Sequence, residues 1–178
     1  MASDAAPTVV LVMGVSGSGK TTVGTALARR RGVPFVEGDG LHPPANIAKM
    51  ASGRPLDDED RAPWLRGVAG LIRAATRTGT GAVVSCSALK REYRDRFRAA
   101  GPGVWFLYLA LDREVAHERV VHRVGHFMPV ALLGSQYDTL EPLEPDEPGL
   151  TVDARAEPPT LLASAQAAIA RSEAARRV

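Results

Sequence analysis

The stretch Gly14-Val15-Ser16-Gly17-Ser18-Gly19-Lys20-Thr21 decides how the rest of this sequence is interpreted. It fits the pattern G-x-x-x-x-G-K-[ST], whose glycines let the backbone come close to phosphate groups. Residues 8–13 before it are apolar and β-branched, as in a buried parallel strand, and residues 21–30 after it follow a helical pattern. A strand, a glycine turn and a helix N-terminus together form an anion site. The sequence therefore predicts a site for a nucleoside triphosphate.

The residues of this loop have expected roles in nucleotide binding. Lys20 is expected to reach the β- and γ-phosphates, and the Thr21 hydroxyl to hold Mg²⁺. The nucleotide-binding set is predicted to be Gly14, Val15, Ser16, Gly17, Ser18, Gly19, Lys20, Thr21 and Thr22. A glycine-rich turn with a chance lysine is the alternative, but the flanking strand and helix argue against it. A dinucleotide fingerprint does not fit, because the third glycine of G-x-G-x-x-G is absent.

Length and composition limit the class of protein. The 178 residues predict one domain (1–178) with a core of useful size, and 45% hydrophobic and 24% charged residues are ordinary for a globular protein. A net charge of +2 without a basic, aromatic-rich block gives no support for nucleic-acid binding. No apolar run is long enough to span a membrane, and residues 1–7 are expected to be a disordered lead-in rather than a signal peptide. The single cysteine, Cys86, fits the cytoplasm and is expected to be a small core residue.

Strand and helix patterns alternate along the chain. Strands are expected at 8–13, 34–37, 82–86, 104–109 and 150–152, and helices at 21–30, 89–100, 113–123, 132–137 and 159–176. A further helix carries an apolar stripe from Trp64 to Ala75, with acidic residues 57–60 at its start, Pro63 in its first turn, and an end near Gly79. Residues 41–65 have few apolar side chains and are predicted to be a long functional connection. This order predicts an α/β fold with a parallel sheet covered on both faces.

Chemistry is expected at the carboxyl ends of the strands, where open α/β sheets bind their ligands. The second strand leads to Glu37 and Asp39, and Asp39 is predicted to orient the acceptor hydroxyl or take its proton. Its alternative is a turn aspartate between two glycines. The third strand leads to Ser87 and, one turn further, to Lys90 and Arg94.

Two arginines on one helix face are the next candidates. Arg119 is predicted to stack on adenine, and Arg123 to neutralise charge on the transferred phosphoryl group. A solvated basic face is the alternative interpretation, since exposed charges of this kind are common. The histidines and the cysteine have no zinc-site spacing, so a structural metal is not expected.

Several blocks beyond the glycine loop resemble the gluconate kinases, a group of small P-loop kinases. They are Gly38-Asp39-Gly40-Leu41-His42-Pro43, Asn46-Ile47-Ala48-Lys49-Met50, residues 53–65 (with Asp60-Arg61-Ala62-Pro63-Trp64-Leu65), residues 86–95 (with Cys86-Ser87-Ala88-Leu89-Lys90), Arg123-Val124-Gly125-His126-Phe127-Met128-Pro129, and Leu132-Leu133-Gly134-Ser135-Gln136 through Leu140-Glu141-Pro142. The resemblance covers about residues 8 to 170. It implies transfer from ATP to the 6-hydroxyl of D-gluconate, Mg²⁺ dependence, a nucleoside-monophosphate-kinase-like fold with a five-stranded parallel sheet, and a cytoplasmic homodimer.

The resemblance also implies where the acceptor and the lid lie. Residues of about 39–65 would bind substrate and about 123–138 would form a mobile lid, with His42, Asn46, Ser87 and His126 among the substrate-binding residues. Two features depart from the family pattern. Val124 stands where some relatives have lysine, and no acidic residue ends strand 82–86. Glu37, Asp39 or water would therefore complete the Mg²⁺ shell.

A carboxylate on the substrate calls for a guanidinium partner. Arg54, Arg61 and Arg94 are the candidates, with Lys49 and Lys90 as helpers, and Arg61 is chosen because it begins the helix expected to cover the acceptor. Its alternative is pairing with the neighbouring acidic residues. Two other functions remain open on the residues alone: a shikimate or nucleotide kinase, and a nucleotide-dependent switch without transfer activity.

Overall fold

Five parallel strands form one sheet in the computed structural model, which describes residues 6–123 and 129–178. Their order is β2-β3-β1-β4-β5, so the strand that leads into the glycine loop lies in the centre. The strands are β1 (Val9–Met13), β2 (Phe35–Glu37), β3 (Ala82–Ser85), β4 (Val104–Ala110) and β5 (Gly149–Asp153). All four pairings are parallel, which confirms the predicted α/β fold and the five strand positions.

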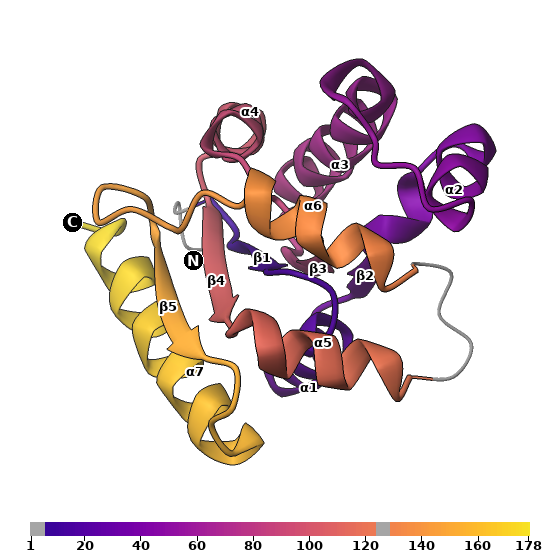
Figure 1. Ribbon diagram of the computed structural model, residues 1–178. Helices are drawn as coiled ribbons and strands as arrows, with labels where there is room; N and C mark the ends of the chain where they lie inside the picture. Colours follow the sequence, from indigo (N-terminus) through magenta and orange to yellow (C-terminus); the bar gives the residue numbers. More distant parts are fainter. Residues whose placement is uncertain (1–5, 124–128) are drawn as a thin grey trace.

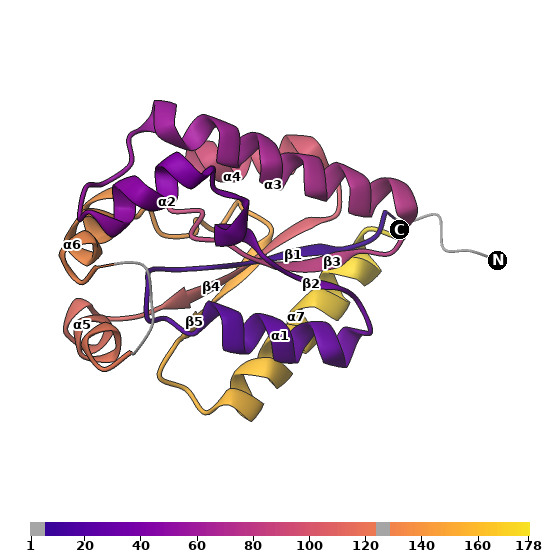
Figure 2. The same cartoon turned by 90° about the vertical axis from the view of Figure 1, so that its right-hand side faces the viewer.

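Helices cover both faces of this sheet (Figure 1). Figure 2 shows α3 (Asp58–Thr78) and α4 (Arg91–Ala100) on one face, and α1 (Lys20–Arg31) and α7 (Pro158–Ala175) on the other. Beyond the carboxyl ends of the strands lie α5 (Arg113–Val121) and α6 (Ala131–Thr139). Helices therefore cover both faces of the sheet and also lie beyond the carboxyl ends of its strands.

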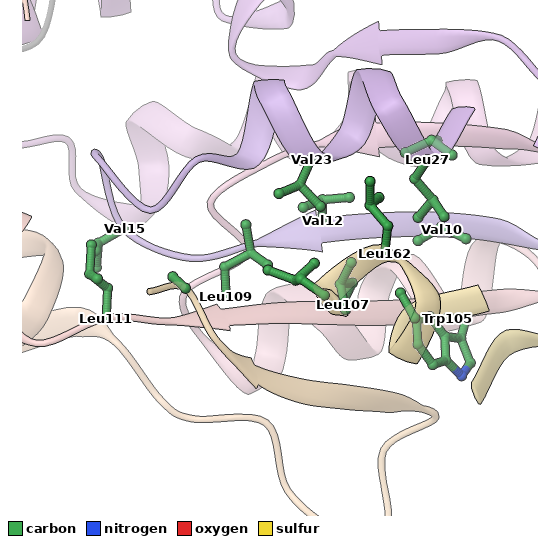
Figure 3. Close-up of a cluster of buried hydrophobic side chains, with 14 of the residues drawn as sticks. Val10, Val12, Val15, Val23, Leu27, Trp105, Leu107, Leu109, Leu111 and Leu162 are labelled. Carbon is green, nitrogen blue, oxygen red and sulfur yellow. The ribbon is translucent and has the colours of Figure 1, made fainter. Parts of the chain in front are cut away.

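The central strand β1 is apolar throughout because both of its faces are buried. Val10 and Val12 pack toward α1 and α7, in the cluster drawn in Figure 3. Val9, Leu11 and Met13 belong to a second cluster with residues of α3 and α4. Two cores thus hold β1 in place, and with it the start of the glycine loop.

The N-terminus of α3 is fixed by a reciprocal capping box. The Asp57 side chain accepts a hydrogen bond from the Asp60 backbone N–H, and the Asp60 carboxylate accepts one from the Asp57 N–H. Because this cap sets the start at Asp58, Pro63 is the sixth helical residue, and the expectation of a first-turn proline was wrong.

Other expectations are also corrected. The stretch 41–65 is not a plain connection, since it contains α2 (Pro44–Ala51) after a 3₁₀ turn at Gly38–Leu41. Helix α2 is only eight residues long, and of its residues only Asn46 and Met50 are buried. Helix α4 begins two residues later than expected and α5 ends at Val121, before Arg123.

Some parts of the predicted organisation lie outside the described residues. Residues 1–5 of the expected lead-in and 124–128 of the expected lid, which include His126, are not described. Among the helices of residues 6–123 and 129–178, none combines the length and hydrophobicity needed to cross a bilayer.

Candidate active site

The glycine loop joins the end of β1 to the start of α1. Gly14 has φ 144° and Gly19 has φ 91°, backbone conformations that favour glycine. A Cβ on Gly14 would also lie only 2.8 Å from the Leu109 carbonyl oxygen. The N-cap of α1, Gly19, makes no side-chain capping bond, and the first helical turn has no acidic residue. This end of α1 therefore presents its backbone N–H groups and its positive dipole end to an anion.

A cleft of about 590 Å³ lies over this loop. It brings together most of the predicted nucleotide-binding residues with both arginines of the predicted pair. Its lining consists of Ser16, Gly17, Gly19, Lys20, Thr21, Thr22, Glu37, Asp39, Gly40, Ile47, Arg119 and Arg123. We refer to it as the nucleotide cleft.

A second, narrower cavity of about 40 Å³ adjoins the nucleotide cleft. Residues of the glycine loop, the 3₁₀ turn, α2, α3 and α6 contribute to it. Its lining consists of Ser16, Lys20, Asp39, His42, Met50, Pro55, Leu56, Arg61, Trp64, Ser87, Leu89, Leu132, Ser135 and Gln136. We call it the acceptor cavity. Ser16, Lys20 and Asp39 line both spaces, so a group passing from one to the other would pass these three residues.

Lys20 lies between the two spaces. Its Nζ donates a hydrogen bond to the Val15 carbonyl oxygen at 3.0 Å. Burial lowers the pKa of Lys20, while the negative charge of Asp39 acts in the opposite direction. A partly buried ammonium near a carboxylate is well suited to receive phosphate oxygens, because few waters compete for its charge.

Glu37 connects the glycine loop to the neighbouring strand. The Thr21 hydroxyl donates to Glu37 Oε2 at 2.7 Å, and the Ser85 hydroxyl donates to Glu37 Oε1. Thr21 and Glu37 supply the oxygen ligands that Mg²⁺ prefers. Within the described ranges no group of three or more His, Cys, Asp or Glu side chains could hold a metal ion. This oxygen pair therefore fits a Mg²⁺ whose other ligands are phosphate oxygens and water.

The wall of the acceptor cavity is built around Trp64. Its Nε1 donates to the Gly38 carbonyl oxygen at 2.9 Å, and the His42 ring stacks on it with centroids 4.8 Å apart. Burial, and secondarily the charge of Arg61, lowers the pKa of His42 to about 4. His42 is therefore a neutral ring at pH 7.

Arg61 lies in the acceptor cavity as predicted for a carboxylate partner. Its Nη1 donates to Tyr93 Oη at 3.3 Å and is 3.9 Å from an Asp58 carboxylate oxygen. Lys90 does not line the cavity; its Nζ contacts both Asp58 oxygens, at 2.8 and 2.9 Å. Asp58 is 60% exposed and engaged mainly by Lys90, so it leaves Arg61 able to turn toward a substrate anion.

Arg94 is not a substrate ligand, and that prediction was wrong. Its side chain is fully buried, and its Nε and Nη2 contact the two oxygens of Glu147 at 2.7 and 2.8 Å. Its remaining N–H groups donate to the carbonyls of Ala88, Leu89, Glu141 and Pro142. The Glu147 partner lies 53 positions away along the chain, a pairing that local spacing could not reveal. Arg94 anchors the loop before β5 to α4.

The remaining predicted substrate residues divide between lining and supporting positions. Ser87 lines the acceptor cavity. Lys49 forms an ion pair with Asp60 at 2.5 Å, outside that lining. Asn46 is buried and donates to the Asp60 carbonyl oxygen at 2.7 Å. Both α2 residues therefore tie α2 to the start of α3.

The predicted arginine pair borders the nucleotide cleft. Arg119 donates to the Gly17 carbonyl oxygen at 3.2 Å and to the Ala154 carbonyl oxygen at 3.3 Å. It thereby links the glycine loop to the segment after β5. Arg123 also lines the cleft. Cys86 is a buried core residue as expected, and burial raises the pKa of its thiol.

Sequence reasoning missed Gln136 as a site residue. Its side-chain oxygen accepts a hydrogen bond from the Ser16 backbone N–H at 2.7 Å, and it lines the acceptor cavity with Ser135. The available signal was its place in the resemblance block that begins at Leu132-Leu133-Gly134-Ser135-Gln136. Gln136 connects α6 directly to the glycine loop.

Comparisons with known proteins identify the family of this chain. Residues 9–143 match a family described as an AAA domain. The chain is 47% identical over 156 residues to a gluconokinase of Gluconobacter oxydans (strain 621H), covering 88% of each chain. The chain belongs to the gluconokinase family. A thermoresistant gluconokinase of Escherichia coli (strain K12) is 42% identical over 144 residues, which is 81% of this chain and 82% of that one.

Two solved structures have the same fold as this chain. An unliganded sugar kinase from Janibacter sp. HTCC2649 is 48% identical with a TM-score of 0.89, covering 94% of this chain and 97% of the other. A gluconokinase from Sinorhizobium meliloti 1021 is 47% identical with a TM-score of 0.83, covering 94% of each chain. A shikimate kinase from Aquifex aeolicus, 15% identical with a TM-score of 0.63, shares the fold alone.

Proposed function

We propose that this protein transfers the γ-phosphoryl group of ATP to the 6-hydroxyl of D-gluconate, giving 6-phospho-D-gluconate and ADP. The observation that carries the proposal is the junction of two spaces at Lys20 and Asp39. The nucleotide cleft suits the triphosphate, and the acceptor cavity combines an arginine with neutral hydrogen-bonding groups. Relatives named gluconokinase across most of the chain give the acceptor its identity.

The residues at the junction have complementary roles in the transfer. Lys20 and the α1 N-terminus neutralise the phosphate oxygens, and Arg123, which also lines the cleft, adds positive charge. Asp39 aligns the acceptor hydroxyl and takes its proton as the loose transition state collapses. Bound Mg²⁺ would neutralise the β- and γ-oxygens, held on the protein side by Thr21 with Glu37 behind it.

We assign binding of the gluconate carboxylate to Arg61, a residue of α3 that lines the acceptor cavity. A planar guanidinium can hold a carboxylate through two parallel hydrogen bonds. Residues of about 39–65 are the acceptor-binding segment and about 123–138 the lid. His126 of that lid is retained as a substrate-binding residue. We further propose that the protein is cytoplasmic and forms a homodimer. Size-exclusion chromatography with light scattering tests the homodimer.

A coupled assay of ADP release tests the function. With ATP and Mg²⁺, release should rise strongly on addition of D-gluconate and stay at background with shikimate or a nucleoside monophosphate. Release stimulated by shikimate or a nucleotide instead would assign the chain to another small-molecule kinase. Tight GTP binding without any acceptor-dependent turnover would favour a switch protein.

A further inference from the structure

We propose that Asn46 holds His42 in the tautomer that carries its proton on Nε2, and that this N–H donates to a hydroxyl oxygen of the acceptor. Asn46 is then a positioning residue and His42 a specificity-determining one. The inference rests on the proposed function for the identity of the acceptor. Its first half, the tautomer, depends only on contacts within the protein.

The orientation of the Asn46 amide is fixed by its stronger contact. The partner at 2.7 Å is the Asp60 backbone carbonyl oxygen, which can only accept a hydrogen bond. The contacting atom must therefore be the Nδ2 amino group. The same Nδ2 lies 3.4 Å from His42 Nδ1. Because Nδ2 carries two hydrogens and no lone pair to offer, a hydrogen bond in this pair requires His42 Nδ1 to be the acceptor.

A neutral imidazole that accepts at Nδ1 carries its hydrogen on Nε2. The lowered pKa of His42 supports the neutral form at pH 7. One face of the ring is covered by Trp64, whose own position is fixed by its bond to the Gly38 carbonyl oxygen. The ring is thus held on one edge and one face.

The Nε2 edge is the one left for the acceptor cavity. His42 lines that cavity and is only partly buried, and the hydrogen bonds within residues 6–123 and 129–178 include none from its Nε2. Arg61 in the same cavity suits the carboxylate, and Asp39 can only accept hydrogen bonds when ionised. A neutral N–H donor supplies the missing partner for a hydroxyl oxygen.

The tautomer is measured by long-range ¹H–¹⁵N correlation spectra of the imidazole rings in uniformly labelled protein at pH 7. The His42 signals are assigned by their loss in His42→Gln. We expect Nε2 protonated and Nδ1 unprotonated in the wild type. In Asn46→Asp the new carboxylate can only accept, so Nδ1 should gain a proton. Lys49→Met, which removes a different α2–α3 tie, should leave the tautomer unchanged.

The donor role is measured in steady-state kinetics. His42→Phe keeps a ring on Trp64 but lacks the N–H. It should raise the KM for gluconate about tenfold or more, the size expected for one lost hydrogen bond. The KM for ATP should change little. His42→Gln, which restores an N–H donor, should recover part of this loss. In a series of mono-deoxy gluconates, one should lose affinity for the wild type but not for His42→Phe.

The outcomes separate the two proposals. Absence of gluconate turnover in the wild type would refute the proposed function, while the ring spectra would still report the tautomer. Gluconate turnover with a proton on Nδ1 or with mixed tautomers would overturn the role of Asn46. A correct tautomer with a wild-type gluconate KM in His42→Phe would overturn the donor role of His42.

Discussion

The nucleotide cleft and the acceptor cavity are built in different ways. The phosphate end of the cleft is made largely of backbone from one continuous loop, held between two large cores by β1. The acceptor cavity is made of side chains from several segments, and its outer wall rests on a separate cluster of Met50, Leu56 and Leu132. Generic phosphate binding is therefore attached to the rigid centre, and substrate specificity to a less firmly held periphery.

The nucleotide cleft and the acceptor cavity also differ in size. A cavity of about 40 Å³ has room for roughly three waters at about 10–15 Å³ each, less than a six-carbon acid requires. The cleft, at about 590 Å³, is already open. We therefore expect the acceptor side to widen more than the nucleotide side when gluconate binds.

The largest expected effect comes from Lys20→Met, which removes the charge shared by both spaces. Transfer should fall to background, because the developing phosphoryl charge loses its buried cation. The melting temperature should stay the same or rise, since burial of the Lys20 ammonium is costly. Measurement of ADP release alongside thermal unfolding checks both; turnover near the wild-type rate would exclude Lys20 from the site.

Asp39→Asn should have the next largest effect, lowering kcat by about 10²–10⁴-fold, the range for loss of a general base. The affinity for ATP, measured by calorimetry, should change much less. An equal loss of ATP affinity would instead make Asp39 part of the metal shell, in place of Glu37.

Arg61→Ala should act on the acceptor side alone. Loss of a charge-assisted contact to the substrate carboxylate should lower kcat/KM for gluconate by about 2–5 kcal/mol in transition-state stabilisation. The KM for ATP should stay constant. Any trace activity on sorbitol, the neutral polyol of equal length, should hardly change. If both acceptors lose activity alike, Arg61 has a structural role with Asp58 and Tyr93.

Arg94→Met separates a buried scaffold residue from the acceptor site. Truncation leaves Glu147 as an unpaired buried charge and should lower the free energy of unfolding by about 3–5 kcal/mol. The gluconate KM of the folded fraction, assayed at low temperature, should stay within a few-fold of the wild type. The double variant with Glu147→Met should regain part of the lost stability, because no unpaired charge remains although the carbonyls that Arg94 served lose their donor. A large, selective rise in gluconate KM would restore Arg94 as a substrate ligand.

The same contrast explains what the sequence could predict. The glycine loop and the apolar strands depend on local pattern, since β1 is buried on both faces and its loop needs glycine at Gly14 and Gly19. The acceptor side depends on contacts between distant residues. Arg94 was misassigned because Glu147 lies far away in the chain, and Gln136 was missed because its contact is the Ser16 backbone.

Helix α2 shows a further limit of the same kind. It is only eight residues long, begins with Pro44 and buries only Asn46 and Met50. What holds it is tertiary: the Asn46 bond to the Asp60 carbonyl, the Lys49–Asp60 ion pair and the contacts of Met50. Local periodicity contains none of these contacts, and they become visible only when α2 and α3 are placed together.

The smallest effect is expected from Leu56→Ala, which weakens the outer wall of the acceptor cavity. Leu56 is buried, but its cluster with Met50 and Leu132 is separate from the two cores that pack on the sheet. The truncation should therefore loosen α2 and α6 locally rather than destabilise the whole fold. We expect the gluconate KM to rise by about three- to tenfold, since the widened cavity encloses its ligand less well once the methyl groups are lost. The KM for ATP should not change.

Hydrogen exchange gives this prediction a readout independent of activity. In Leu56→Ala, amides of α2 and α6 should exchange faster while those of β1 keep their protection. The matched control is Ile72→Val, in the core between the sheet and α3, which should lower the free energy of unfolding by about 0.5–1.5 kcal/mol without changing the gluconate KM. Uniformly faster exchange in Leu56→Ala, including β1, would mean that the acceptor wall unfolds together with the sheet. The two halves of the site would then be one cooperative unit, and the contrast between a rigid nucleotide side and an adaptable acceptor side would be wrong.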